Sequence, residues 1–175
     1  MKVAAKYEEI YPPENEDYLY ICDGAYTEAQ LLACEAAILQ TLDFDLSPHS
    51  QHRFLERFLT LETADDVLAS YSQYLVECAA IEYKLVGIKP SIVAAAALYL
   101  GKKVLKRKPA WTLEAETGYK DKDLRHVAKE LCSILNTIQS SPQKNYFRHV
   151  HKKFCSAKFF EVARIQSDGS YKRDD

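Results

Sequence analysis

The 175-residue sequence has no excess of either charge, no long hydrophobic run and no paired cysteine motif. Its net charge is −2, so it lacks the surplus of cations that sequence-independent binding to nucleic acids requires. The most apolar run, residues 92–100, is too short to cross a bilayer and is rich in alanine. We therefore expect neither a nucleic-acid partner nor a membrane partner.

The cysteines do not form the pattern of a disulfide framework. They are odd in number and contain no C-x-x-C pair: Cys22, Cys34, Cys78, Cys132 and Cys155. Such usage indicates a reducing compartment and ordinary core thiols. The N-terminus also lacks the charged and apolar regions of a signal peptide. We expect an intracellular, soluble protein.

Signatures of catalysis are also lacking. The sequence contains no Ser-His-Asp set, no paired carboxylates and no glycine-rich phosphate loop, so we expect no enzyme, no catalytic residue and no cofactor. His149, His151 and Cys155 are the one candidate metal cluster, but their spacing matches no common zinc pattern. A basic, solvated helix face explains them better, and we predict no metal site.

What the sequence does have is helical periodicity, with almost no alternating strand pattern. A capping box, Thr27 with Gln30, opens an apolar helix that would turn Leu31, Leu32, Ile38, Leu39 and Leu42 to one face. Ser47 and Pro48 offer an N-cap and a first-turn proline for the next helix. The stretch SIVAAAALYL is apolar nearly all round and should be a central, enclosed helix. The predicted fold class is all-α.

Four more helices are expected in the second half of the chain or close to it. The segment around residues 67–81 should turn Val67, Leu68, Tyr71, Tyr74, Leu75, Cys78 and Ile81 inward. The segment 120–138 should do the same with Leu124, Val127, Ala128, Leu131, Leu135 and Ile138, of which Ala128 is the only small residue. A last helix would carry Tyr146, Phe147, Val150 and Phe154, and WTLEAE, residues 111–116, would form a short one.

A weak internal repeat runs through these helices. In both copies a helix that contains alanine leads through a short aromatic segment to an amphipathic helix. The sets Leu31/Ile38/Leu42 and Leu124/Leu131/Leu135, one in each copy, share the same spacing of seven and four residues. The second copy is preceded by two further helices, roughly residues 48–83, whereas the first begins with the chain.

Two charged residues lie on apolar helix faces. Lys6 falls within the stripe Val3, Tyr7 and Ile10, on a helix that must end before Pro12 and Pro13. Glu35 lies between Leu31 and Ile38, where an unpaired charge would cost several kcal/mol if buried. Two explanations stay open. In the first, which needs no partner, Lys6 and Glu35 pair with each other and fix the helix packing, or Lys6 simply extends to solvent. In the second, both residues reach the backbone of a partner at the edge of an exposed apolar surface. That surface would consist of Val3, Tyr7, Leu39, Phe44 and Leu46.

Longer stretches around these residues point to a known family. KYEEIYPPE, a short aromatic segment and then YTEAQLLACEAAILQTLDFDL closely resemble the A/B-type mitotic cyclins. SQHRFLERFL, KPSIVAAAALYL, TGYKDKDL and FRHVHKKF fit the same family in the same order. The resemblance implies tandem cyclin folds. The last three helices of the first cyclin box would occupy residues 1–46, a complete five-helix second fold residues 47–160, and a polar tail residues 161–175.

The resemblance also implies a function in the cell cycle and in mitosis. The chain would be a regulatory subunit of a cyclin-dependent serine/threonine protein kinase, would bind the C-helix of that kinase and would favour its active state. The family's charged contacts match Lys6 and Glu35, and its apolar contacts match Val3, Tyr7, Leu39, Phe44 and Leu46. Such a protein would be found in the nucleus and the cytoplasm.

Parts of the family pattern have no counterpart in the sequence. The first two helices of the first fold are not there, so we expect the family's substrate-docking patch to be absent, together with its N-terminal destruction motif. This leaves an alternative function: a truncated cyclin-fold interaction module that competes for the kinase without activating it.

Overall fold

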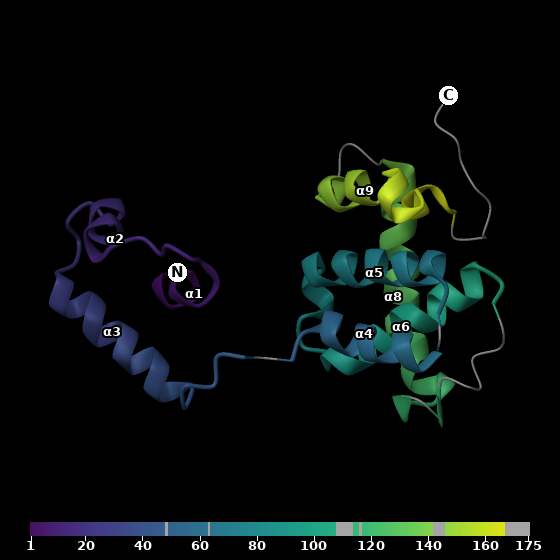
Figure 1. The fold of residues 1–175 in the computed structure, drawn as a ribbon, viewed down its shortest axis with the longest axis horizontal. Coiled ribbons are helices and arrows are strands. Elements are labelled where there is room, and N and C mark those ends of the chain that lie inside the picture. The colour runs from purple at the N-terminus through teal and green to yellow at the C-terminus, as the bar shows by residue number, and fades with distance from the viewer. Residues whose placement is uncertain (48, 63, 108–113, 116, 142–145, 167–175) are drawn as a thin grey trace. The chain divides into compact units, whose positions relative to one another are not determined.

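A computed structural model describes residues 1–47, 49–62, 64–107, 114–115, 117–141 and 146–166 (Figure 1). The chain forms two compact units, Met1–Pro48 and His49–Asp175, which we call the N-terminal and the C-terminal unit. The described parts of both are helical, which confirms the all-α class. Within these described parts, no helix combines the length and the apolar character needed to cross a bilayer.

The N-terminal unit contains α1 (Lys2–Glu8), α2 (Asn15–Ile21) and α3 (Glu28–Thr41). The predicted capping box starts α3: the Gln30 N–H donates to Thr27 Oγ1 at 3.3 Å, and the Thr27 N–H donates to Gln30 Oε1 at 2.9 Å. Because these bonds satisfy amides that have no intrahelical partner, they fix where α3 begins.

The apolar face expected on α3 is largely exposed. Leu32, Ile38 and Leu42 are 43–48% exposed, and α3 has no buried residue at all. The predicted apolar face of α3 is therefore a surface, and not a core, among the described residues. The stripe on α1 is also shorter than predicted, because α1 ends at Glu8 and the extended backbone of Glu9 leads toward the two prolines. Ile10 therefore lies outside the helix and is 89% exposed.

The C-terminal unit contains α4 (Gln51–Glu62), α5 (Asp66–Ile81), α6 (Pro90–Val104), α8 (Asp121–Ser140) and α9 (Arg148–Phe154). Helix α6 packs against α4, α5 and α8 (Figure 1). All its residues from Val93 to Lys102 are buried, which confirms the prediction of a central, enclosed helix. The six inward positions predicted for α8 are buried as well. On α5 the prediction fails only at its end, where Ile81 is 42% exposed.

Two boundaries differ from the sequence prediction. Helix α4 begins at Gln51 rather than at the Ser47-Pro48 pair, and the Arg53 N–H donates to Ser50 Oγ at its start. The predicted tail begins too early, because a 3₁₀ turn at Val162–Arg164 carries Val162 and Ala163 into the core. Residues 167–175 of that tail, and residues 111–113 and 116 of the predicted short helix, lie outside the described residues.

One glycine of α6 allows its close contact with α5, and one buried ion pair joins α6 to α4. A Cβ on Gly101 would lie only 3.0 Å from Ser72 Oγ, so a side chain there would force α5 and α6 apart. The next residue, Lys102, is 2% exposed, and its ammonium lies 2.6 Å from Glu62 Oε1 on α4. Lys102 is therefore structural, whereas Lys103, Lys106 and Arg107, the other described cations of this basic segment, are exposed.

Candidate functional site

Glu35 on α3 binds two lysines of α1 at once. Lys2 Nζ lies 2.7 Å from Glu35 Oε2, and Lys6 Nζ donates to Glu35 Oε1 at 2.7 Å. The two lysines are four residues apart and so occupy the same face of α1. The structure thus shows Lys6 and Glu35 paired with each other, as in the first of the two explanations above.

The two lysines differ sharply in exposure. The side chain of Lys2 is 7% exposed and that of Glu35 is 12% exposed, whereas that of Lys6 is 53% exposed. Lys2 therefore neutralises the carboxylate as a buried counter-ion, whereas Lys6 exposes its ammonium to solvent. Sequence reasoning overlooked Lys2, although its position one helical turn before Lys6 was a usable signal.

The electrostatics of the cluster favour the ionised carboxylate. Hydrogen bonding from Lys2, and after it from Lys6, lowers the pKa of Glu35 below its ordinary value, and this outweighs the opposite effect of burial. Glu35 is therefore charged at neutral pH, and both lysines keep their counter-ion. The cluster is a fixed arrangement of charges with one cation at the surface.

The C-terminus of α3 places two of the predicted apolar residues together. The Phe44 N–H donates to the Leu39 carbonyl at 2.9 Å, and the Asp43 N–H donates to the Gln40 carbonyl at 3.1 Å. With Asp43 at φ 48°, these bonds form a Schellman motif, in which the residue after the left-handed position comes back toward the last turn of the helix. Phe44 is 67% exposed and Leu39 is half-buried, so the helix end presents an aromatic ring to solvent.

A second polar contact holds α1 to the segment after α3. The Tyr7 hydroxyl and the Ser47 hydroxyl lie 2.6 Å apart, while Tyr7 is 54% exposed. Ser47 thus bonds to α1 instead of capping α4. Val3 and Leu46, the other two predicted contact residues, are half-buried in the same unit. That all seven residues contact a partner stays a prediction.

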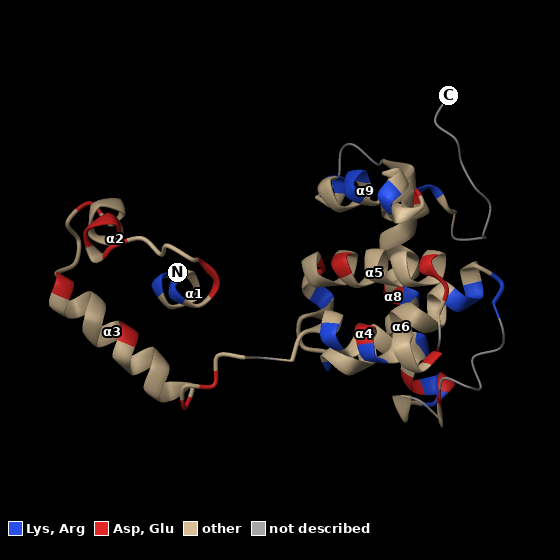
Figure 2. Ribbon diagram, in the orientation of Figure 1, with Lys and Arg blue, Asp and Glu red and all other residues tan. Residues whose placement is uncertain are grey.

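The N-terminal unit is strongly acidic. Residues 1–48 contain two lysines, no arginine and ten aspartates and glutamates, a net charge of −8. Figure 2 shows α1 with the lysines of this unit and α3 with only two acidic positions, which are Glu28 and Glu35. Both lysines bind Glu35, and Lys2 is buried, so Lys6 has the one exposed cationic side chain among the described residues of this unit.

The other candidates from the sequence give no site. His149 lies within 3.1 Å of the Arg148 guanidinium, and Cys155 Sγ lies 3.7 Å from His151 Nδ1. No three metal-ligating side chains come together among the residues that the structure describes. Cys22 and Cys34 are exposed, so the prediction of core thiols is wrong for them, whereas Cys78 is buried, which raises its pKa to about 12.

Comparison with known proteins places these units in a family. The model of the cyclin N-terminal domain matches residues 1–47, and that of the cyclin C-terminal domain matches residues 48–168. The G2/mitotic-specific cyclin-B of Marthasterias glacialis is 37% identical over 169 residues, which are 95% of this chain and 42% of the relative. That of Dictyostelium discoideum is 37% identical over 166 residues, 93% of this chain and 37% of the relative. Cyclin-B1-2 of Arabidopsis thaliana is 33% identical over 165 residues, 93% of this chain and 36% of the relative. The chain therefore spans about two fifths of the length of these curated relatives.

Proposed function

Because this chain belongs to the cyclin family, we propose that it is a regulatory subunit of a cyclin-dependent protein kinase and acts in cell-cycle progression. In this role it performs no chemistry of its own and works where mitotic kinases work, in the nucleus and the cytoplasm. The kinase supplies the catalytic groups, and the chain supplies a surface that selects one conformation of them.

The mechanism is a shift of population between two states of the kinase. Phosphoryl transfer requires an ion pair between a lysine on strand β3 of the kinase and a glutamate on its C-helix. A partner that binds the C-helix only in its inward position stabilises the state in which this pair is formed. The size of the shift is set by how much more tightly the partner binds that state than the other.

The observation that carries the proposal is the exposed ammonium group of Lys6, which is held by Glu35. The Lys6 ammonium has three N–H donors and gives one to Glu35, so others remain for main-chain carbonyls of a partner. In the same unit, Tyr7 and Phe44 expose more than half of their surface. Exposed aromatic side chains together with a held cation suit a binding surface, because the rings supply contact area and the cation sets the register.

The first experiment separates the two lysines. Isothermal titration of the full chain into a purified cyclin-dependent kinase should show binding, and Lys6→Ala should weaken it at least tenfold. Lys2→Met is the matched control, because it removes the other lysine of the same carboxylate from a position that is only 7% exposed. We expect Lys2→Met to reduce the stability of the N-terminal unit while the affinity of the folded protein stays within about threefold. Equal affinities for the wild type and Lys6→Ala would remove Lys6 from the binding surface.

The second experiment measures what binding does. Phosphorylation of a peptide substrate by the kinase should increase when the chain is added to saturation, and the increase should follow the binding curve. Saturated binding without any increase would support the alternative function, in which the chain competes for the kinase and does not activate it. Absence of binding would contradict both.

A further inference from the structure

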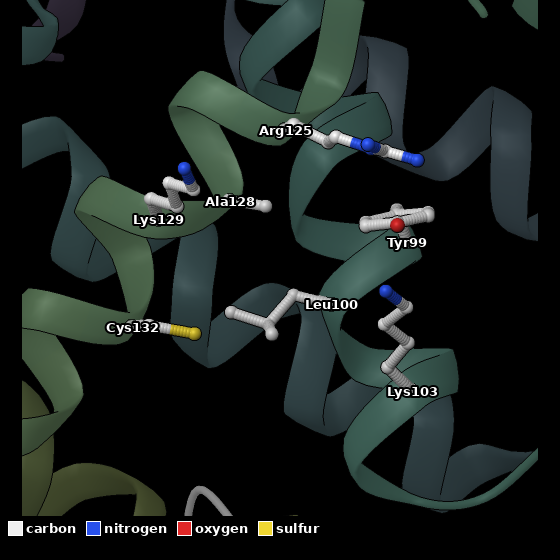
Figure 3. A pocket seen from close by; sticks show the side chains of 7 residues that line it. All are labelled: Tyr99, Leu100, Lys103, Arg125, Ala128, Lys129 and Cys132. Carbon is white, nitrogen blue, oxygen red and sulfur yellow. The ribbon is translucent and has the colours of Figure 1, made fainter. Parts of the chain in front are cut away.

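We propose that a hollow between α6 and α8 binds an acidic peptide segment of a partner protein, which inserts one apolar side chain. This hollow, the α6/α8 pocket, has a volume of about 240 Å³. Figure 3 shows the residues that line it: Tyr99, Leu100, Lys103, Arg125, Ala128, Lys129 and Cys132. It lies within the C-terminal unit, so the proposal goes beyond kinase binding and does not depend on it.

The hollow exists because one inward position of α8 is small. The buried face of α8 consists of leucine, isoleucine and valine except at Ala128. Opposite Ala128 lie Tyr99 and Leu100 of α6, which are only 3% and 5% exposed. A pocket of this volume is smaller than the sites that enclose drug-sized ligands, and it suits a single aliphatic or aromatic side chain. The apolar walls therefore call for one anchor residue from a partner.

The rim of the pocket is cationic. In Figure 3 the side chains of Arg125 and Lys103 extend on opposite sides of the Tyr99 ring. Lys103 Nζ lies 4.7 Å from the centre of that ring. None of the residues that line the pocket is acidic. One carboxylate stands next to them: Asp121 Oδ2 accepts from the Tyr99 hydroxyl at 3.2 Å and lies 3.3 Å from the Arg125 guanidinium.

Asp121 offsets Arg125 and leaves two cations of the rim uncompensated. Lys103 and Lys129 are both exposed, and neither belongs to an ion pair within the part of the chain that the structure describes. The whole unit has the same sign: residues 49–175 contain 21 lysines and arginines against 15 aspartates and glutamates, a net charge of +6. An apolar hollow beside two free ammonium groups is complementary to an apolar side chain flanked by carboxylates. We therefore assign the pocket to an acidic peptide.

A defined probe tests this chemistry. A fluorescein-labelled heptapeptide with leucine at its centre and three aspartates on each side is titrated with the full chain, and fluorescence anisotropy is measured. We expect saturable binding that weakens as sodium chloride rises from about 50 to 500 mM, because partly exposed charges are screened. Replacing the central leucine of the probe by alanine should weaken binding about tenfold, since the anchor side chain is lost.

Variants of the protein locate the binding. Lys103→Glu with Lys129→Glu should weaken binding at least tenfold, because two attractions become repulsions. Lys122→Glu with Lys152→Glu is the matched control: it makes the same change of charge at two exposed lysines that do not line the pocket, and affinity should change less than threefold. Ala128→Leu fills the hollow and should also abolish binding, with circular dichroism used to show that the helices are retained.

Four outcomes would overturn the proposal. The first is that the probe shows no saturable binding, and the second is that both charge-reversal double variants lose the same amount of affinity for it. The third is equal affinity for the leucine and alanine probes, and the fourth is that the chain binds anionic lipid vesicles more tightly than the peptide. A fifth concerns the chain itself, because Asp43-Phe44-Asp45 has the same chemistry as the probe. If sedimentation shows dimers that the probe disperses and Phe44→Ala abolishes, the occupant is a second copy and not another protein.

Discussion

The two units of this chain are stabilised in opposite ways. In the C-terminal unit one helix, α6, is enclosed by others, and a continuous set of apolar side chains surrounds it. In the N-terminal unit the described residues bury only Lys2, Ala5 and Tyr18. Polar contacts join its elements instead: Glu35 with two lysines, Tyr7 with Ser47, and Asn15 with Glu28 at 2.8 Å. The comparison shows that similar helical patterns can form a core in one unit and a surface in the other.

This difference fits the two roles proposed above. A unit that leaves Tyr7 and Phe44 exposed has apolar area available for a partner, and that area is stabilised only when a partner covers it. A unit with a closed core binds only where its packing leaves a hollow, as at Ala128. The following predictions test whether the contrast between the units holds in solution.

The largest effect should come from truncating a leucine in each unit. Leu98 on α6 is fully buried, so Leu98→Ala should lower the free energy of unfolding of the C-terminal unit by about 3–4 kcal/mol through lost burial and a new cavity. Leu32 on α3 is 44% exposed, so Leu32→Ala should cost less than about 1 kcal/mol. Urea unfolding followed by circular dichroism, with amide exchange to assign each change to its unit, measures both.

One result would break the contrast. If Leu32→Ala costs as much as Leu98→Ala, the face of α3 is covered in solution, by a second copy or by another part of the chain. Measuring the same pair of variants at several protein concentrations distinguishes these, because only association depends on concentration.

The second prediction concerns pH and the polar contacts of the N-terminal unit. The pKa of Glu35 is lower in the folded state than its ordinary value of 4.5, so the unfolded chain takes up this proton more readily. Its contribution to stability is present above that ordinary value and is lost as pH falls through the lowered pKa. Glu35→Gln should cost about 1–2 kcal/mol at pH 7 and progressively less in acid.

Glu9→Gln is the control for this titration, because Glu9 is an exposed carboxylate of the same unit. Urea unfolding at pH 7, 5 and 3 should give Glu9→Gln the same pH dependence as the wild type. A pH dependence of Glu35→Gln that equals the wild type's would show that the cluster does not link α1 to α3 in solution.

The amino-acid pattern predicted the C-terminal unit well and the N-terminal unit only in part. On α8 the apolar positions recur over the whole helix, and other helices supply the surface that covers them, so the predicted face is the buried face. On α3 the pattern was equally apolar, yet Ile38 and Leu42 are exposed. Periodicity states which residues share a face, but it does not state whether anything covers that face.

Within the candidate site, the pairing of Lys6 with Glu35 could be foreseen because both are charges on apolar faces. The Tyr7–Ser47 contact could not, since it joins residues 40 positions apart through two hydroxyls that have no preferred sequence pattern. The turn that ends α3 could not be foreseen either, because Asp43 and Phe44 have the left-handed backbone conformation there, whereas a glycine would have been the recognisable signal.

The smallest predicted effect lies at that left-handed position. Asp43 has φ 48° and follows the negative end of the α3 dipole, so both its backbone and its charge are unfavourable there. Asp43→Asn removes the charge alone and should stabilise the N-terminal unit by about 0.3 kcal/mol. Asp43→Gly also removes the backbone strain and should raise the free energy of unfolding by up to about 1 kcal/mol, although glycine is more flexible in the unfolded chain.

Gly24→Ala at the end of α2 is the reverse experiment. At Gly24 φ is 69° and no atom lies within 4 Å of the added Cβ, so a loss of about 1 kcal/mol in stability would come from the backbone alone. Urea unfolding of the three variants measures these differences. If Asp43→Gly loses stability as Gly24→Ala does, the turn after α3 is not left-handed in solution, and Phe44 is not placed next to Leu39 by the helix end.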